Sequence, residues 1–327
     1  MTAESASVPA APFREIELDL DALAANVARF RELTDGAPLF VDLGADAWGH
    51  GLAVIAPALV SLGAEAFFVS RLDEAERLRP LTPRTLIVTT QHSIDEDFRR
   101  AAALRVAPLV RSPAEYLRAV AGGVDGLVLA EDTGSGLPGL GATDLATLGE
   151  DARRRGLAVL LDTEFPAIGA ELLGLSEREL DVSEDFRPVL RLWAPVAATK
   201  RVHAGAGVSY GYTYTTTTET TLALVTLGYA DGLDRAAGNR GRIAIADRTV
   251  TIAGRVAMDA FMVDLGDVTA PPLGTPVTVI GDREHDEPTA FDLAGSLGTV
   301  SAEITTRLSA RPRRRGRSAG TDGTGAA

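Results

Sequence analysis

The run FVDLGADAWGHG, from Phe40 to Gly51, joins a short apolar strand to a turn rich in glycine, aspartate and histidine. Its apolar start is typical of a strand buried in a parallel sheet. Asp42 and Gly44 are two residues apart, so strand alternation predicts that both face the same side, toward the interior of a barrel. The stretch therefore predicts a carboxylate beside a position that has no side chain.

Around this run, residues 13–163 alternate short apolar strands with helical stretches. Six segments are expected to be strands: Phe40–Leu43, Ala66–Ser70, Thr85–Thr90, Ala107–Val110, Leu127–Glu131 and Leu157–Leu161. Five are expected to be helices: Leu52–Leu62, Leu72–Arg79, Asp95–Leu104, Pro113–Val120 and Asp144–Arg155. Asp21 and Ser112 are the expected caps of two helices. This order predicts a (β/α) barrel or a doubly wound sheet.

A second domain is expected after Pro188, where the segments alternate and are rich in Thr, Val and Ile. Its expected strands are Val189–Val202, Thr215–Thr226, Gly241–Asp247, Arg248–Val256, Ala260–Val263 and Pro276–Val279, which indicate a compact β domain. The polar stretch Ser176–Pro188 marks the boundary. We predict a disordered arm over 1–12, a barrel-like domain over 13–187, a β domain over 188–310 and a disordered basic, glycine-rich tail over 311–327.

The composition sets limits on the class of protein. The chain has 327 residues, enough for a barrel-sized domain and a smaller one. It has no cysteine, which excludes disulfides and a thiolate nucleophile and agrees with a cytoplasmic location. The net charge of -13 argues against nucleic acid as the main partner, and no apolar run is long enough to cross a membrane. The whole chain contains one lysine, Lys200.

Several motifs resemble those of the alanine racemase family and occur in the family's order. They are Ala47–Gly51, Asp132–Gly134, Val208–Gly211, Gly228–Gly232 and Gly254–Asp259. The resemblance covers most of the chain and implies an α/β barrel, here shortened, followed by a C-terminal antiparallel β domain. It also implies a homodimer with sites at the subunit interface and a small-molecule substrate.

The same resemblance implies that the groups which hold pyridoxal phosphate in this family are missing. The family's lysine, which forms a Schiff base with the cofactor, corresponds to Gly44. Two tyrosines that hold the phosphate correspond to Trp48 and Ala302, and a lysine that is often carbamylated corresponds to Ala130. Lys200 lies in an alternating strand, where a solvated side chain is expected. We therefore expect no cofactor, and the scattered histidines predict no metal site.

The residues that remain suggest a different site, in which Tyr210 matches the family's second acid/base. The candidate catalytic residues are Tyr210, Asp42, Asp132 and Glu164, and the candidate substrate-pocket residues are Trp48, His50, Tyr229, Met258 and Asp259. Carboxylates clustered at strand ends would have raised pKa values, which suits general acid/base catalysis. For each group a purely structural role stays open as the alternative to catalysis. Tyr210 would then be an aromatic side chain packed at a domain interface, and the carboxylates would face outward or cap helices.

These features lead to the hypothesis of a repurposed protein of this fold that does not use pyridoxal phosphate. It would be a cofactor-independent acid/base enzyme, of the isomerase, lyase or cyclase type, acting on a small organic molecule. One alternative is a non-catalytic scaffold or heterodimer partner of a true racemase, and another is a pyridoxal-phosphate-dependent amino-acid racemase. Six strands cannot close an eight-stranded barrel, so an unusually open site is expected.

Overall fold

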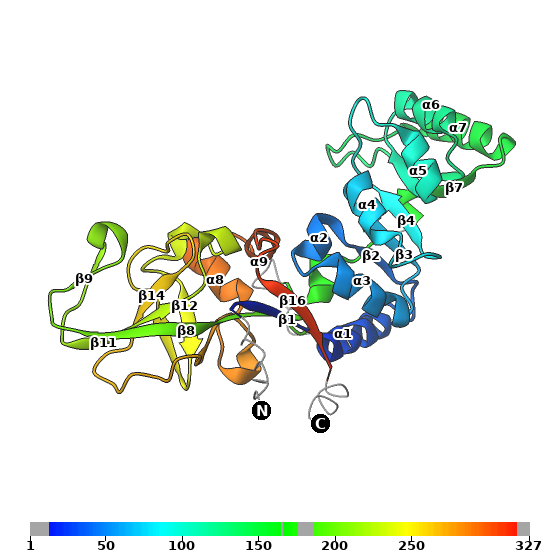
Figure 1. Ribbon diagram of the computed structural model, residues 1–327. Helices are drawn as coiled ribbons and strands as arrows, with labels where there is room; N and C mark the ends of the chain where they lie inside the picture. The colour runs from blue at the N-terminus through cyan, green and yellow to red at the C-terminus, as the bar shows by residue number, and fades with distance from the viewer. Residues whose placement is uncertain (1–12, 165, 176–185, 319–327) are drawn as a thin grey trace, which may run out of the picture. The chain divides into compact units, whose positions relative to one another are not determined.

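The computed structural model of the chain describes residues 13–164, 166–175 and 186–318. The chain divides into two compact units, which are described separately. The barrel-like unit comprises residues 27–172. The C-terminal unit comprises residues 173–327 together with residues 1–26 (Figure 1).

The barrel-like unit is built on six parallel strands that follow one another in chain order, from β2 to β7. The strands are β2 (Phe40–Asp42), β3 (Ala66–Val69), β4 (Leu86–Thr89), β5 (Ala107–Val110), β6 (Gly126–Leu129) and β7 (Ala158–Leu161). The connecting helices are α3 (Leu52–Ser61), α4 (Leu72–Leu78), α5 (Phe98–Leu104), α6 (Pro113–Gly122) and α7 (Ala142–Arg154), and α1 (Leu20–Leu33) precedes the sheet. Every strand and helix predicted for this region is confirmed, with small shifts at the ends.

One face of this sheet forms an apolar core that includes Phe68, Val88, Leu109 and Val128. The predicted cap of α6 is confirmed, because the Ser112 hydroxyl accepts a hydrogen bond from the amide of the third helical residue at 3.2 Å.

The predicted cap of α1 is wrong by two residues. The carboxylate of Asp19 accepts hydrogen bonds from the amides of Asp21 and Ala22, at 2.9 and 2.8 Å. The helix therefore begins one residue before Asp21, and Asp21 lies in its first turn.

The parallel sheet is open within the described residues. β7 pairs only with β6 there, and most of its residues are partly exposed. On the opposite edge, Ile168 forms a parallel bridge to Val41, and its amide donates to the Phe40 carbonyl at 2.9 Å. Only a single bridging residue thus lies beside β2 where a closed barrel has a full strand, which agrees with the shortened barrel expected from the sequence.

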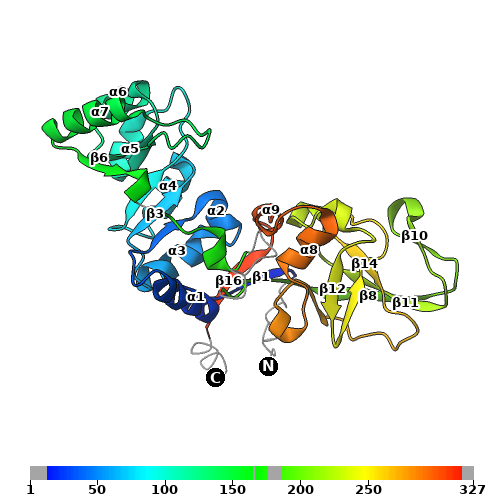
Figure 2. The same ribbon diagram turned by 180° about the vertical axis from the view of Figure 1, so that it is seen from behind.

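The C-terminal unit is a mostly antiparallel β domain. Its main sheet runs in the order β13 (Arg248–Thr251), β12 (Arg242–Ile245), β15 (Pro276–Ile280), β8 (Leu190–Val202), β1 (Glu15–Asp19) and β16 (Arg313–Arg317). The long strand β8 also pairs with β11 (Thr220–Val225), which pairs with β14 (Phe261–Asp264). A small hairpin of β9 (Gly207–Val208) and β10 (Tyr214–Thr215), and the helices α8 (Ala290–Leu297) and α9 (Ser301–Thr306), complete the unit (Figure 2).

Two sequence-based boundaries need correction. Residues 311–327 were predicted to be a disordered tail, but Arg313–Arg317 forms β16, which pairs in parallel with β1. β1 itself was predicted to belong to the barrel-like domain, and it lies instead in the main sheet of the C-terminal unit. The pairing places arginines of β16 opposite the acidic residues of β1, so charges of opposite sign face each other across the strands. Residues 319–327 and the predicted arm over 1–12 lie outside the described residues.

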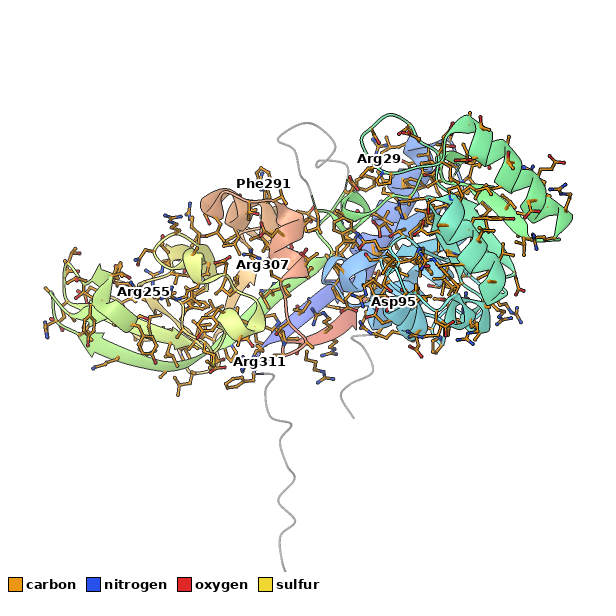
Figure 3. The ribbon with its side chains drawn as sticks, turned by 90° about the horizontal axis from the view of Figure 1, so that it is seen from above. Arg29, Asp95, Arg255, Phe291, Arg307 and Arg311 are labelled. Carbon is orange, nitrogen blue, oxygen red and sulfur yellow. The ribbon has the colours of Figure 1, made fainter. Side chains whose placement is uncertain are left out.

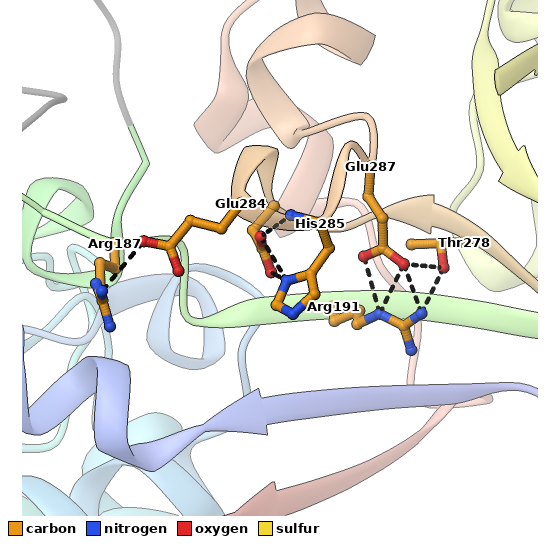
Figure 4. A network of polar contacts seen from close by, with 7 residues as sticks. Arg187, Arg191, Thr278, Glu284, His285 and Glu287 are labelled. Atoms are coloured by element: carbon orange, nitrogen blue, oxygen red, sulfur yellow. Dashed lines mark hydrogen bonds and ion pairs between the residues drawn. The ribbon is translucent and has the colours of Figure 1, made fainter. Parts of the chain in front are cut away.

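A polar network crosses the surface of the C-terminal unit beside β8 (Figure 4). Arg191 contacts the Glu287 carboxylate at 2.6 Å and donates to the Thr278 hydroxyl at 2.7 Å. The His285 ring nitrogen Nδ1 lies 2.8 Å from a carboxylate oxygen of Asp282, which raises the histidine pKa. These interactions attach the segment after β15 to the sheet.

No helix in the described ranges is both long enough and apolar enough to cross a membrane.

Candidate functional site

The turn that follows β2 is the most unusual backbone segment of the barrel-like unit. In α2 (Gly44–Trp48), four consecutive residues with side chains, Ala45 to Trp48, have φ values between 52° and 59°. A left-handed helical conformation costs an L-amino acid about 1–2 kcal/mol per residue. Such strain persists only where surrounding structure holds it, and it concentrates at functional sites.

Side chains of neighbouring elements hold this left-handed turn. The carboxylate of Asp46 accepts hydrogen bonds from the Leu52 amide at 3.2 Å and from Arg77 at 2.7 Å. The Asp46 amide donates to Glu74 at 3.1 Å. The indole Nε1 of Trp48 donates to the carbonyl of Asp42 at 3.0 Å, which closes the turn back onto β2.

Asp42 lies at the end of β2, where the strained turn begins. Its carboxylate accepts a hydrogen bond from the Gly44 amide at 2.8 Å. Burial raises the pKa of the Asp42 carboxyl, and the nearby negative charges of Glu74 and Glu171 raise it further, whereas the Gly44 hydrogen bond opposes them. A carboxyl with a raised pKa can hold and release a proton closer to neutral pH than an exposed aspartate.

Gly44 occupies the position directly beside this carboxyl. A Cβ at residue 44 would lie 2.9 Å from the Ser70 hydroxyl oxygen and 3.2 Å from a carboxylate oxygen of Asp42. Both atoms end side chains, so each has some freedom to move. The space next to the Gly44 backbone is thus occupied by a hydroxyl and a carboxylate.

The expected cluster of three carboxylates is not formed by direct contacts. Asp132 and Glu164 are both exposed, and no hydrogen bond or ion pair in the described part of the chain joins either to Asp42. Asp132 accepts a hydrogen bond from the Gly134 amide at 3.0 Å, so it closes a local turn. Both residues follow the last strands of the open sheet, where no further strand covers them.

His50, predicted to line the pocket, is fully buried beneath the turn. Its Nδ1 lies 3.1 Å from the Trp48 carbonyl oxygen. The ring of Trp48 itself is partly buried and packs close to Gly169, where an added Cβ would lie 3.0 Å from the indole. His50 therefore supports the turn from a buried position, while the Trp48 ring packs against Gly169.

His92, which is not among the residues predicted from the sequence, has an acidic neighbour in the structure. His92 follows β4 in the run Gln91–Ser93, and the acidic residues Asp95–Asp97 come directly after this run. The structure brings in Glu115 from α6, with 3.7 Å between its carboxylate and the His92 Nδ1. The two residues are 23 positions apart in the chain, so no local spacing rule reveals the pair.

In the C-terminal unit, three of the predicted residues are strongly exposed. Tyr210 is 74% exposed, Met258 54% and Tyr229 43%. Tyr229 and Met258 lie on two turns that are joined by backbone hydrogen bonds, among them one from the Ala230 amide to the Met258 carbonyl at 3.0 Å. Tyr229 and Met258 thus lie on neighbouring exposed turns of the C-terminal unit.

Asp259 is held by an arginine from the segment predicted to be disordered. Arg311, labelled in Figure 3, contacts Asp259 at 2.5 Å and the fully buried Asp231 at 3.3 Å. Asp231 is also paired with Arg14. Arg311 therefore links the turn of Tyr229 to the turn of Met258, a role that its position in a basic run did not reveal.

Comparison with known proteins places this architecture in a family. Residues 18–161 match the model of the alanine racemase N-terminal domain, and residues 189–316 match that of the C-terminal domain. The chain belongs to the alanine racemase family. The alanine racemase of Thermobifida fusca is 34% identical over 363 aligned positions, with 91% of this chain and 96% of that protein covered. The alanine racemase of Streptomyces coelicolor is 32% identical, with 90% and 93% covered.

Solved alanine racemase structures share the fold. That of the Streptomyces coelicolor enzyme is 30% identical, covers 93% of this chain and 97% of its own, and has a TM-score of 0.80. The Bartonella henselae structure, described as having covalently bound pyridoxal phosphate, is 21% identical, with 94% and 100% covered and a TM-score of 0.78. The 363 positions aligned with the Thermobifida fusca protein exceed the 327 residues of this chain, so part of that relative has no counterpart here.

Covalent attachment of pyridoxal phosphate in an alanine racemase fold requires an amine side chain, and this chain offers only Lys200. Lys200 is exposed on β8, where it pairs with Leu222 in the C-terminal unit. At the end of β2, the barrel-like unit instead presents Gly44, Asp42 and Ser70. The residues present do not fit a covalently attached aldehyde cofactor.

Proposed function

We propose that this chain is an acid/base enzyme of the alanine racemase family that acts on a small amino acid or a related molecule without covalently attached pyridoxal phosphate. The observation that carries the proposal is the partly buried Asp42 carboxyl beside Gly44. Gly44 would stand where the family's lysine stands, and Asp42 would be the proton-transferring group of the barrel-like unit.

The environment of Asp42 supports this role. Its raised pKa follows from burial and from the negative charges of Glu74 and Glu171, so its protonated form is more favoured than that of an exposed aspartate. General acid/base catalysis by such a group typically accelerates a reaction by about 10²–10⁴-fold. That range suits isomerisation or elimination of a substrate whose proton is already activated by a neighbouring carbonyl or leaving group.

The second group would be Tyr210 of the C-terminal unit. Its ring is 74% exposed, so the hydroxyl is available to a molecule outside that unit. The exposed Met258 and Tyr229 would line the same pocket. In the proposed homodimer, the C-terminal unit of one subunit supplies these side chains to the barrel-like unit of the other.

The names of the relatives favour a second candidate, an amino-acid racemase that uses pyridoxal phosphate. They are 30–34% identical across about nine tenths of this chain. In that case the cofactor would be held without the usual amine, or through Lys200. The two candidates differ in whether the reaction uses pyridoxal phosphate.

One experiment separates the candidates. The purified protein is incubated with pyridoxal phosphate, treated with borohydride and analysed by intact mass and peptide mapping, and conversion of L-alanine to D-alanine is measured in parallel. Our proposal expects no racemisation. Racemisation that requires pyridoxal phosphate would establish the second candidate, and its loss together with the covalent label in Lys200→Arg would place the bond at Lys200. A label without racemisation is the ordinary reaction of an exposed lysine with the aldehyde.

The proposed activity itself is tested on a panel of amino acids and related small molecules by monitoring solvent deuterium incorporation. Deuterium uptake that is lost in Asp42→Asn supports the proposal, and undiminished uptake in that variant contradicts it. Absence of any uptake, together with co-purification of a lysine-bearing relative, would instead indicate a non-catalytic partner subunit.

A further inference from the structure

A buried histidine connects two loops at the carboxyl edge of the parallel sheet. His92 lies in the loop between β4 and α5, and its side chain is fully buried. Its Nε2 lies 3.0 Å from the hydroxyl oxygen of Thr89, the last residue of β4. Its Nδ1 has no hydrogen-bond partner among the described residues and lies 3.7 Å from a Glu115 carboxylate oxygen. The imidazole therefore contains one buried nitrogen that faces a carboxylate without bonding to it.

Glu115 is fixed in place by the turn that precedes α6. Its carboxylate accepts a hydrogen bond from the Arg111 amide at 2.8 Å, and its own amide donates to the Ser112 hydroxyl at 3.2 Å. Ser112 caps the start of α6, and the Glu115 carboxylate is bonded to the amide of the residue just before that cap. The carboxylate that faces His92 is thus part of a rigid element.

The loop that carries His92 has few other attachments to α6. Arg118 of α6 donates to the carbonyl oxygens of Ser93 and Ile94, at 3.3 and 2.5 Å. The side chain of Ile94 is 93% exposed at the tip of the loop. The start of the loop is tied to the neighbouring strand by backbone bonds from Thr90 and Gln91, and further along the loop the His92 side chain is fully buried.

Four features of the surroundings act on the imidazole. Burial is the largest and lowers the His92 pKa, and the positive charge of Arg111 at the end of β5 acts in the same direction. The negative charges of Glu115 on α6 and Glu96 in the loop itself oppose them, and the net pKa is lowered. The ring of Phe98 covers one side, with 5.1 Å between the ring centres. The packed arrangement thus favours a neutral imidazole.

We propose that Thr89, His92 and Glu115 form a proton-sensitive latch, which holds the β4–α5 loop in place at neutral pH and releases it in mild acid. When the loop opens, the imidazole becomes solvated and regains an ordinary pKa of about 6.5. The opened form therefore takes up a proton before the packed form does, and acid shifts the equilibrium toward opening. Between about pH 7.5 and about pH 5.5, this linkage raises the open population by at most about tenfold. The latch does not depend on the proposed function.

Hydrogen–deuterium exchange of the full-length protein tests the latch. Peptides covering residues 90–98 are followed at both pH values, with labelling times scaled for the intrinsic pH dependence of exchange. We expect a several-fold increase in corrected exchange of this loop in acid, and no such increase in His92→Gln, which cannot titrate. His203→Gln, which removes an exposed histidine of the C-terminal unit, is the matched control and keeps the wild-type response.

A second measurement does not rely on a variant of the buried residue. Proton titration of the histidines by NMR is expected to give His92 a midpoint below the ordinary histidine value of about 6.5. The proposal is overturned if His92 titrates like an exposed histidine, if the loop of the wild type shows no acid response, or if His92→Gln opens in acid to the same extent.

Discussion

Gly44 and Ser70 face each other across the end of two neighbouring strands, so that a Cβ on residue 44 would lie 2.9 Å from the Ser70 hydroxyl oxygen. The backbone of Gly44 lies outside the left-handed region, which begins at Ala45. Only the hydroxyl of Ser70 and the carboxylate of Asp42, both at the ends of side chains, oppose a larger residue there. The backbone at residue 44 therefore accepts a side chain, and the Ser70 hydroxyl and the Asp42 carboxylate are what limit its size.

Gly44→Lys therefore provides a direct test of the lost attachment point. In Gly44→Lys with Ser70→Ala, we expect borohydride treatment in the presence of pyridoxal phosphate to give a covalent label at residue 44, because the smaller alanine makes room for the new side chain. Peptide mass mapping locates the label. Gly44→Ala with Ser70→Ala is the control and stays unlabelled at this position. Failure of the lysine variant to react would mean that the surrounding site no longer accommodates the cofactor.

Asp42→Asn is expected to separate activity from stability. Because the pKa of Asp42 is raised in the fold, its stabilising contribution is greatest below the unfolded pKa of 3.8 and is lost as pH rises through the folded pKa. At neutral pH the ionised carboxylate opposes folding, and Asn keeps an oxygen that accepts from the Gly44 amide. The unfolding free energy at neutral pH is thus expected to be unchanged or higher, while proton exchange on a substrate falls by about 10²-fold or more.

Urea denaturation of Asp42→Asn and wild type at about pH 5 and about pH 8 checks the stability part of this prediction. Asp42→Ala, which removes the acceptor of the Gly44 amide, serves as the destabilised comparison. A marked loss of stability in Asp42→Asn alone would show that the carboxylate charge supports the turn.

The ion pair between Arg191 and Glu287 is expected to stabilise the C-terminal unit. Burial alone would raise the pKa of Glu287, but hydrogen bonds from Arg191 and Thr278 outweigh it and lower the pKa. The contribution is therefore present above the unfolded pKa of 4.5 and is lost as pH falls. Glu287→Gln is expected to cost about 2 kcal/mol at neutral pH, since these are charged hydrogen bonds in a partly buried site.

Glu284→Gln is the matched control for this pair. Its partner Arg187 lies 3.1 Å away, but both side chains are more than half exposed. An exposed pair contributes about 0–1 kcal/mol. Equal losses in the two glutamate variants, measured by urea unfolding, would contradict the importance assigned to burial.

Arg311→Ala is expected to weaken the C-terminal unit, because it removes one of the two charged partners of the buried Asp231. Arg311→Lys restores the charge but not the two-sided contact with Asp231 and Asp259, so an intermediate loss is expected. Arg242→Ala, at an exposed position of β12, is the control and is expected to change stability by less than about 0.5 kcal/mol. If Arg311→Ala does not lower the unfolding free energy, Arg311 does not stabilise the unit, and the expectation of a solvated basic segment would hold.

The sequence predicted the parallel strands well because each is short, mostly apolar and bounded by turns. Phe68 and Val88 lie in the core because strands of a parallel sheet that is covered on both faces consist mainly of apolar residues. The prediction failed for β16, whose five residues include four arginines. Its pairing depends on acidic residues of β1 almost 300 positions away, and local composition contains no information about that partner.

The candidate site could be predicted only in part. Strand alternation selected Asp42, and in the structure its carboxyl is partly buried and has a raised pKa, whereas its catalytic role stays a prediction. The expected grouping with Asp132 and Glu164 was not found, since the sequence gives the strand that each follows but not the path of the loop behind it. The pairing of His92 with Glu115 arose between two loops, which no spacing pattern describes.

The sequence by itself determined the family, the order of strands and helices, and the presence of a single lysine, because these depend on residue types and on periods of burial along the chain. Tertiary structure alone decided that Ala45–Trp48 winds in the left-handed sense, that Ser70 lies beside Gly44, and that Arg311 reaches Asp231. These features depend on contacts between segments that are distant in the chain. Such contacts produce no regular pattern of residues along the sequence from which they could be predicted.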